Sequence, residues 1–285
     1  MENTHCLVCS RKESSPFLTL SDRLTQSTEK FVLIQCMCGF VYLNPRPTVK
    51  EIYKYYKSEI YDPHVKYSTK AWDKLYKYVQ QLTFRWKYNI LNSFYNCGRL
   101  LDIGGGKGDF VKYIYEKEWD VTFQDSIVAS KALNIKISFV AALSDLHLSE
   151  RYDVITLWHS MEHIHDIQSL FDQISNLLND SGLLMIAVPN LNAPERIYYG
   201  KNWAPYDVPR HLYHFQMSSL IELCEKYKFN VLRKYSMFQD TPYNILLSIP
   251  NLNPLHIFMG ILIFIFSFIK KFLYEARYLI TLHFI

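Results

Sequence analysis

The sequence lacks any block rich in lysine and arginine, although its formal net charge is +4 and 20% of its 285 residues are charged. Proteins that bind nucleic acid usually gather basic residues into such clusters, so we expect no nucleic-acid partner. The amino-terminal residues MENTHCLVCSRKE also lack the apolar segment of a secretory signal peptide. We therefore expect the protein to reside in the cytoplasm, which is a reducing compartment.

The sequence also lacks an apolar run as long as the roughly 20 residues that one membrane-spanning helix needs. The longest such run is LHIFMGILIFIFSFI, residues 255–269, and Lys270 and Lys271 follow it. Because this run has no polar face, three interpretations are open: an interfacial or re-entrant membrane anchor, a helix that covers the core or a homodimer contact, and a true span. An anchor would hold the protein at the inner face of the membrane, where anionic headgroups attract lysine.

Hydrophobic residues make up 49% of the chain, which is typical of a globular protein rather than a disordered one. Short apolar runs alternate with helix-compatible segments beyond residue 99, and this alternation indicates an α/β fold with helices on both faces of a sheet. The expected strands are residues 100–103, 119–124, 137–140, 152–157, 182–188 and 229–235.

The segment LLDIGGGKGDF, residues 100–110, carries the strongest functional signal. An apolar strand leads directly into glycines at 104, 105, 106 and 108, and a helix-compatible segment follows from Asp109. A turn this tight needs positive φ angles or close approach of the backbone to a ligand, and glycine permits both. The spacing differs from the dinucleotide-binding pattern G-x-G-x-x-G, because Asp109 stands where that pattern has its third glycine.

The G-x-G-x-G spacing, with Asp102 two residues before the first glycine, resembles motif I of class I S-adenosylmethionine-dependent methyltransferases. The resemblance implies a Rossmann-like sheet and a loop that wraps the methionine moiety of the cofactor. The alternative is a tight strand-to-helix turn that binds no ligand. The expected cofactor-binding residues are Asp102, Gly104, Gly105, Gly106, Gly108, Asp125, Ser126, Leu143 and Trp158.

Asp125 is assigned to the ribose hydroxyls because it ends the second strand about 20 residues after the glycine loop. Its alternative role is that of a helix cap. The resemblance implies that the adenine ring lies against Leu143 and its neighbours. Asp145 either reaches the exocyclic amine of adenine or is a solvated loop charge.

Four of the six cysteines form two close pairs, Cys6-x-x-Cys9 and Cys36-x-Cys38. Two such pairs separated by a loop match the layout of a zinc ribbon, with four thiolates around one structural Zn²⁺ ion. The second pair is one residue shorter than usual, and His5 is a possible substitute ligand. A redox dithiol and unligated core cysteines are the alternatives.

Thr48 is expected to cap a helix that begins at about Val49, since Pro45 and Pro47 end the preceding strand. Residues 1–56 resemble the amino-terminal region of a bacterial methyltransferase group that carries a zinc-binding segment and often acts in sugar or polysaccharide biosynthesis. Residues 66–95 are expected to be helical, either packed on the sheet or closing over the cofactor. The predicted parts are a zinc-ribbon-like module (1–47), a helical lid or linker (48–95), the methyltransferase domain (96–240) and a hydrophobic tail (241–285).

Two segments are expected to border the acceptor. In WHSMEHIHDI, residues 158–167, the resemblance places Trp158 and His159 at the methyl-transfer cavity, while Glu162 and His163 fix the loop onto the sheet. Catalysis by a metal bound to the histidines and a purely structural cluster are the alternatives. The motif H-E-x-x-H is absent.

The segment 190–215 is rich in proline, tyrosine and histidine and is expected to be an irregular substrate-binding loop. His211 is the leading general base, since histidine has a pKa suited to that task. Asp207 would orient it, and Arg210 would hold an anionic group. Tyr206 and His159 complete the expected catalytic residues, and the alternative is that these residues only fix the loop.

The predicted function is methyl transfer from S-adenosylmethionine to a small-molecule acceptor, which is a sugar, another glycan-pathway intermediate or a lipid-linked molecule. One alternative is O-methylation of a polyprenyl quinone or another lipid, which accounts better for the tail. Another is an RNA methyltransferase whose zinc ribbon binds the nucleic acid, which the lack of basic clusters disfavours.

Overall fold

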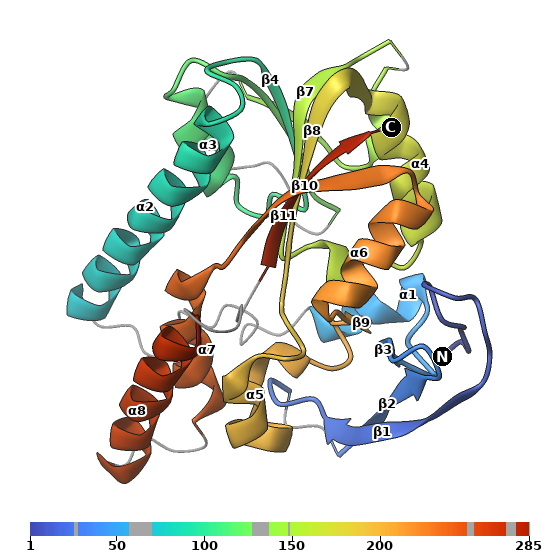
Figure 1. Ribbon diagram of the computed structural model, residues 1–285, viewed down its shortest axis with the longest axis vertical. Helices are drawn as coiled ribbons and strands as arrows, with labels where there is room; N and C mark the ends of the chain where they lie inside the picture. The colour runs from blue at the N-terminus through green and yellow to red at the C-terminus, as the bar shows by residue number, and fades with distance from the viewer. Residues whose placement is uncertain are drawn as a thin grey trace.

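The computed structural model describes residues 1–25, 28–56, 70–126, 137–147, 149–249, 254–271 and 278–284. A seven-stranded sheet occupies the centre, and a four-stranded sheet lies below its lower edge (Figure 1). The larger sheet consists of β4 (Arg99–Ile103), β5 (Asp120–Gln124), β6 (Ser138–Val140), β7 (Tyr152–Trp158), β8 (Leu178–Val188), β10 (Phe229–Tyr235) and β11 (Tyr278–Phe284). The smaller sheet consists of β1 (Ser14–Ser21), β2 (Lys30–Cys36), β3 (Val41–Leu43) and β9 (Tyr213–His214).

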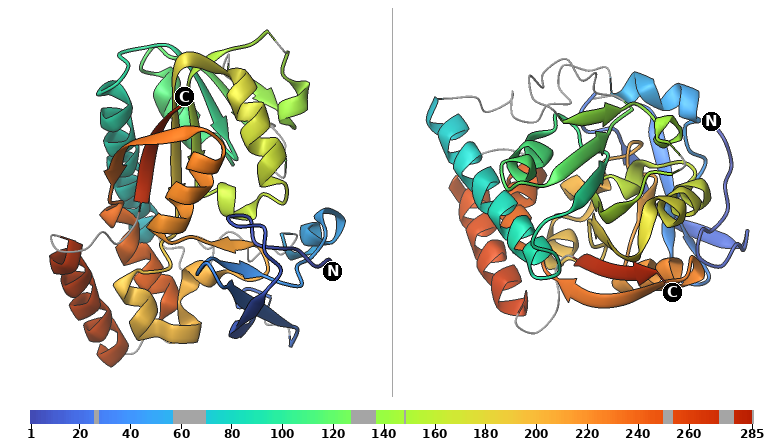
Figure 2. Two further views of the ribbon diagram at one scale, coloured as in Figure 1. Left: turned by 45° about the vertical axis from the view of Figure 1, so that its right-hand side comes forward. Right: turned by 90° about the horizontal axis from the view of Figure 1, so that it is seen from above.

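The helices lie on both faces of the larger sheet, as the sequence predicts. Helices α2 and α3 cover one face, and α4 and α6 cover the other (Figures 1 and 2). The α-helices are α1 (Val49–Ile52), α2 (Lys70–Asn92), α3 (Asp109–Tyr115), α4 (Ile167–Leu177), α5 (Pro194–Tyr199), α6 (Met217–Lys226), α7 (Thr241–Ser248) and α8 (Pro254–Lys271).

The strand order β10-β11-β8-β7-β4-β5-β6 confirms the predicted α/β, Rossmann-like fold class. Strands β4 to β8 pair in parallel, so their carboxyl ends meet at one edge of the sheet. Ligands of such sheets bind outside these carboxyl ends. Strand β8 begins at Leu178, four residues before the expected start at Gly182, because the chain passes from α4 directly into the strand.

Strand β11 is the largest departure from the sequence-based expectation. It lies between β8 and β10 and pairs antiparallel with both, from Tyr278 opposite Val188 to His283 opposite Leu183 on the β8 side. The side chains of Ile280 and Leu282 are fully buried in the core. The domain boundary expected at residue 240 is therefore wrong, because the segment assigned to a hydrophobic tail supplies an inner strand of the sheet.

Helix α8 covers the apolar run expected at 255–269 and packs against α7 and α5. A Cβ atom on Gly260 would lie 3.2 Å from Cγ2 of Ile245, so the absence of a side chain there allows α8 to lie close to α7. In the part of the chain that the structure describes, no helix has the length and apolarity needed to cross a membrane.

The smaller sheet joins the amino-terminal segment to the chain that follows β8. Strand β9 pairs with β3, with Val41 opposite His214 and Tyr42 opposite Tyr213. Buried side chains of both sheets form one continuous core cluster. The segment 190–215 is thus more ordered than expected, since it contains α5, short 3-10 turns and β9.

Helix α1 begins where the sequence predicts, after the cap residue Thr48. The Thr48 hydroxyl accepts a hydrogen bond from the backbone N–H of Glu51, and the Glu51 carboxylate accepts one from the backbone N–H of Thr48. This reciprocal arrangement is a capping box, which stabilises the first turn of a helix. Helix α2 packs against α3 through the ring contact between Phe84 and Phe110, so its described part is a packing helix against this face of the sheet.

Candidate functional site

The glycine loop between β4 and α3 has the backbone conformation that the sequence predicts. Gly104, Gly106 and Gly108 have φ angles of +73°, +56° and +76°, in the left-handed region that other residues rarely adopt. A side chain on Gly104 would collide with Ser160, and one on Gly105 would lie 3.0 Å from Phe123, so these two positions are closed by packing. No heavy atom lies within 4 Å of a Cβ atom placed on Gly106, which leaves room for a ligand.

Asp125 lies directly beside this loop. Its Oδ2 atom accepts a hydrogen bond of 2.9 Å from the backbone N–H of Gly106. The carboxylate is therefore fixed at the carboxyl end of β5, on the rim of the open space at Gly106.

Asp102 is buried below the loop rather than lining it. Burial raises its pKa to about 6, although the Thr156 hydroxyl, which donates a 2.6 Å hydrogen bond, and the charge of Lys87 oppose the shift. The Asp102 side chain is 3% exposed, so it supports the loop from inside the sheet. From this buried position the Asp102 carboxylate does not contact a molecule bound at the loop, contrary to the expectation.

The remaining expected cofactor residues lie along the same edge. Ser126 follows Asp125 and is exposed, and Leu143 opens the single 3-10 turn Leu143–Asp145 after β6. The carboxylate of Asp145 accepts a 2.9 Å hydrogen bond from the backbone N–H of Ala142, so it caps this turn.

Lys87 lies beside the expected site residue Trp158, although it was not among the residues expected from the sequence. It projects from α2, is 7% exposed, and its Nζ atom lies 4.1 Å from the centre of the Trp158 ring and 5.1 Å from that of Phe110. Burial lowers its pKa to about 8, against the opposing charges of Asp240 and Asp102. A buried lysine needs a compensating partner. No motif or spacing in the sequence singles out Lys87.

His159 is partly exposed and has a carboxylate partner from a distant part of the chain. Its Nε2 atom lies 3.0 Å from Oδ2 of Asp240, which ends the 3-10 turn Phe238–Asp240 before α7. His159 has a φ angle of +53°, an uncommon conformation for a residue other than glycine. The β7 end that carries it is attached to the glycine loop, because the Ser160 hydroxyl donates a 2.8 Å hydrogen bond to the Ile103 carbonyl.

His163 and His211 lie against each other with ring centres 4.6 Å apart. The Glu162 side chain beside them is fully buried, and its Oε1 atom lies 3.8 Å from Nδ1 of His159. Burial lowers the pKa of His163 to about 3 and also lowers the pKa of His211, so both rings are neutral near pH 7. The two predicted acceptor segments therefore meet at this cluster.

Arg210 does not hold an external anion, contrary to the expectation. Its guanidinium is fully buried and bonds Asp22 at 2.7 and 3.0 Å and Asp207 at 2.7, 3.0 and 3.1 Å, and it also donates to the Tyr55 carbonyl. Burial alone would raise the pKa of Asp22 and of Asp207, but the guanidinium outweighs this and lowers both. All of its donors are directed into the protein.

The structure also changes the expectations for two other predicted catalytic residues, Asp207 and Tyr206. Both Asp207 oxygens accept from Arg210, and the nearest approach of Asp207 to His211 is 4.0 Å, beyond hydrogen-bond distance. Asp207 thus orients Arg210 rather than His211. The Tyr206 side chain is 2% exposed and packs edge-on against Trp203, so it does not face an acceptor.

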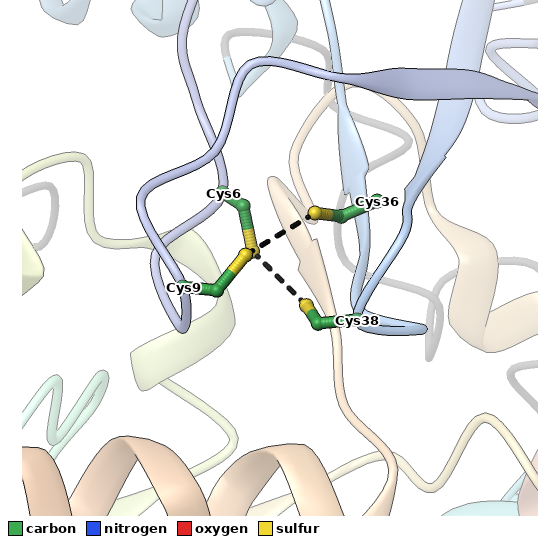
Figure 3. A group of neighbouring side chains, drawn as sticks. All are labelled: Cys6, Cys9, Cys36 and Cys38. Carbon is green, nitrogen blue, oxygen red and sulfur yellow. Dashed lines mark hydrogen bonds between the residues drawn. The ribbon is translucent and has the colours of Figure 1, made fainter.

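The four cysteines of the two expected knuckles converge in space (Figure 3). Their Sγ atoms all lie within 4.8 Å of one another, with 3.5 Å between Cys6 and Cys38 and 3.4 Å between Cys9 and Cys36. Burial would raise the pKa of Cys9, but hydrogen bonds from the backbone of Arg11 and from the other cysteines lower it to about 7. Four sulfur atoms at this spacing can surround one tetrahedral ion.

Comparison with protein-family models identifies one family. A family model described as a methyltransferase domain matches residues 72–234. A solved structure of the 1,6-didemethyltoxoflavin-N1-methyltransferase of Burkholderia thailandensis, with 1,6-didemethyltoxoflavin and S-adenosylhomocysteine bound, is similar at 16% identity and a TM-score of 0.54. That match covers 90% of this chain and 96% of the other.

Weaker similarity extends to two other solved structures. An S-adenosylmethionine-dependent methyltransferase from Mesorhizobium loti matches at 16% identity and a TM-score of 0.43, over 66% of this chain and 91% of that one. The cyclopropane synthase MmaA2 from Mycobacterium tuberculosis matches at 16% identity and a TM-score of 0.42, over 65% and 77%. A search of curated proteins returned no match.

Replacing Arg210 with methionine should lower the free energy of unfolding by about 3–5 kcal/mol at neutral pH, because the fully buried carboxylate of Asp22 and the mostly buried one of Asp207 lose their common partner. Chemical denaturation measures this loss. Arg99→Met is the matched control: its side chain is 42% exposed and its ion pairs are on the surface, so the cost should stay below about 1 kcal/mol. Equal losses in the two variants would contradict the assignment.

The same cluster predicts the direction of the pH dependence. Since the pKa values of Asp22 and Asp207 are lowered in the folded state, their contribution is present above the unfolded-state pKa near 4. It is lost as the pH falls further, through the folded-state values. Denaturation measured between pH 7 and pH 3 should therefore show a fall in wild-type stability that is smaller in Arg210→Met.

Proposed function

Because this chain belongs to the methyltransferase-domain family and is an S-adenosylmethionine-dependent methyltransferase, we propose that it methylates a small hydroxyl-rich acceptor. The acceptor class is a sugar, another glycan-pathway intermediate or a lipid-linked molecule. One observation carries the proposal: His159, Glu162, His163 and His211 gather beside the glycine loop, at the carboxyl edge of the sheet. Such a cluster offers several hydrogen-bond partners and a general base to a molecule with hydroxyl groups.

The geometry of the glycine loop supports our assignment of the cofactor residues. The open face of Gly106 would receive the methionine moiety, and Asp125 on its rim would accept hydrogen bonds from the ribose hydroxyls. We assign the Lys87 ammonium to the cofactor carboxylate and Leu143 to the adenine ring. Bound S-adenosylmethionine supplies an electrophilic methyl group, so the chain itself needs to orient the acceptor and remove a proton.

His159 is the general base that the contacts favour, in place of His211. An ionised Asp240 accepts the Nε2–H proton of His159, which leaves a lone pair on Nδ1. That nitrogen faces the cluster, 3.8 Å from Glu162. His211 has no carboxylate within hydrogen-bond distance among the contacts described above, so its ring cannot be oriented in the same way.

The first test is cofactor binding. Calorimetry should detect binding of S-adenosylhomocysteine to the purified chain, and Asp125→Ala should weaken it about 10–100-fold, as expected for a lost hydrogen bond to a charged group of about 1.5–3 kcal/mol. Asp120→Ala is the matched control, because Asp120 lies at the opposite end of β5. Equal affinities in the two variants would remove Asp125 from the ribose site.

The second arm of this test concerns the base. Labelled methyl groups from S-adenosylmethionine should appear in glycan or lipid fractions of cells that express the gene. His159→Ala should lower that transfer about 10²–10⁴-fold, with affinity for S-adenosylhomocysteine changed less than about threefold. Normal transfer by His159→Ala together with a large loss in His211→Ala would return the role of base to His211.

The alternative acceptors differ in what they would need from the protein. A polyprenyl quinone or another lipid remains compatible with the apolar α8 and would be found in the lipid fraction of the same experiment. An RNA acceptor has the least support, since the sequence contains no basic cluster around the cysteine pairs.

We propose that the four-cysteine cluster holds one structural zinc ion. Ideal Zn–S bonds of about 2.3 Å around a tetrahedral ion separate the sulfur atoms by about 3.8 Å, and the Sγ atoms here fit that spacing. Cys36 ends β2, and Cys6 lies in the segment before β1, whose first residue pairs with Cys36, so the ion would join this segment to the turn after β2 at one end of the small sheet. His5 is exposed and lies outside the group of ligand atoms.

Elemental analysis should therefore find about one zinc ion per chain. The double variant Cys6→Ser/Cys9→Ser should lose the ion and unfold at a lower temperature, because metal binding and folding are coupled. Cys97→Ser, at an exposed cysteine outside the cluster, should retain both the ion and the stability. A chain purified without chelators that contains no zinc would refute the proposal.

We further propose that α8 attaches the protein to an anionic membrane surface. Five apolar side chains on one face of the helix are 42–57% exposed: Phe258, Ile261, Leu262, Ile265 and Phe266. Helix α5, which contacts α8, also exposes two large apolar side chains, Ile197 and Tyr198. The sequence has no acidic residue between Thr241 and Tyr274, and α8 ends at two lysines. Apolar contact and attraction to anionic headgroups then act together.

Flotation with vesicles tests this proposal. The full chain should float with vesicles that contain phosphatidylglycerol and much less with neutral phosphatidylcholine vesicles. Ile261→Glu/Ile265→Glu should abolish flotation, whereas Leu232→Glu, at an exposed apolar residue of β10, should not. A chain that forms dimers and never floats would identify the α8 face as a subunit contact instead.

A further inference from the structure

A second group of metal-ligating side chains lies beside the proposed acceptor site, apart from the cysteines. Glu162, His163 and His211 each offer one ligand atom, and these atoms all lie within 4.8 Å of one another. The two segments are joined next to the group, because the Leu212 backbone N–H donates a 2.8 Å hydrogen bond to the Glu162 carbonyl. This contact keeps His211 close to the other two residues.

Backbone carbonyls fix the tautomers of both histidines. Nδ1 of His163 lies 3.1 Å from the Arg210 carbonyl oxygen and 3.0 Å from the Tyr56 hydroxyl, which can accept as well as donate, and Nδ1 of His211 lies 2.8 Å from the Pro205 carbonyl oxygen. A carbonyl can only accept a hydrogen bond, so each Nδ1 carries the proton and donates it. Each Nε2 atom is left with a lone pair. Histidines that bind metals in proteins are oriented in this way.

The depth of the group also suits a metal. The Glu162 side chain is fully buried and those of His163 and His211 are partly buried, so the three ligand atoms lie inside the protein rather than on its surface.

We propose that Glu162, His163 and His211 bind one divalent transition-metal ion at the acceptor site. Imidazole nitrogens favour ions such as Zn²⁺, Fe²⁺ and Co²⁺ over Mg²⁺ and Ca²⁺. Three protein ligands leave a coordination position open, as in catalytic rather than structural metal sites. The ion is distinct from the one proposed for the cysteines, which contribute four sulfur ligands and leave no open position.

The role of this ion rests on the proposed function. An acceptor oxygen at the open position would have its hydroxyl pKa lowered by the cation. The proton would pass to Nδ1 of His159, which lies 3.8 Å from Glu162 and therefore borders the same position. His159 is not one of the three residues whose ligand atoms come together in this group.

Binding of Co²⁺ to the full-length, zinc-loaded chain tests the proposal without the acceptor. Calorimetry should show one Co²⁺ ion bound per chain. The visible spectrum should contain ligand-field bands but no thiolate-to-cobalt charge-transfer band. The absence of that band would show, without any variant, that the Co²⁺ ion is not bound by the cysteines. His163→Ala, His211→Ala and Glu162→Gln should each weaken binding by about 100-fold or more, beyond the 10–100-fold typical of lost outer contacts.

His147→Ala is the matched control, because His147 is exposed and lies outside the group. It should leave Co²⁺ affinity unchanged. Thermal unfolding establishes whether each variant is folded. If a variant is not folded, the spectrum of the Co²⁺-loaded wild type still tests whether the metal site exists. Absence of Co²⁺ binding to the wild type, or equal affinity in His163→Ala, overturns the metal site even if S-adenosylhomocysteine binds. Binding of Co²⁺ by the group supports the site even if the cofactor test fails.

Discussion

The buried contacts of Arg210 hold the site together. Its guanidinium joins Asp22, which follows β1, to Asp207 and to the Tyr55 carbonyl, and so connects three segments that are far apart in the sequence. A buried ion cluster is tolerated only when each charge has its partners. The loop that carries His211 is therefore fixed against the amino-terminal module, and the position of that histidine depends on residues almost 190 positions earlier.

Neighbouring histidines are thereby given different chemistry. Backbone carbonyls hold His163 and His211 with the proton on Nδ1, whereas the Asp240 carboxylate holds the proton of His159 on Nε2. The lone pairs of the three rings consequently lie on different nitrogens. Environments that separate the roles of like groups are a general means of assigning acid, base and ligand functions. Here the roles of the three histidines differ because of their hydrogen-bond partners, and none of these partners belongs to a recognisable sequence motif.

The sequence was informative where local rules decide the structure. The glycines at 104, 106 and 108 indicated their own φ angles, and Thr48 with Glu51 indicated the start of α1. It failed where distant segments meet. The distant partner of Arg210 is Asp22, and that of His159 is Asp240. No rule of sequence spacing relates the two residues of either pair. The apolar pattern of 278–284 fits a strand as well as a hydrophobic tail. Its position between β8 and β10, which only the three-dimensional structure reveals, identifies it as a strand.

The position of β11 imposes an order of assembly on the chain. Strand β10 precedes it by 42 residues, yet β10 has no direct hydrogen bonds with β8 and reaches the sheet only through β11. During synthesis, β8 therefore waits with an open hydrogen-bonding edge until residues 278–284 leave the ribosome. Open edges of this kind attract other strands. In the meantime α6 and β10 are already synthesised, but β10 has no neighbouring strand through which to join the sheet until β11 is made.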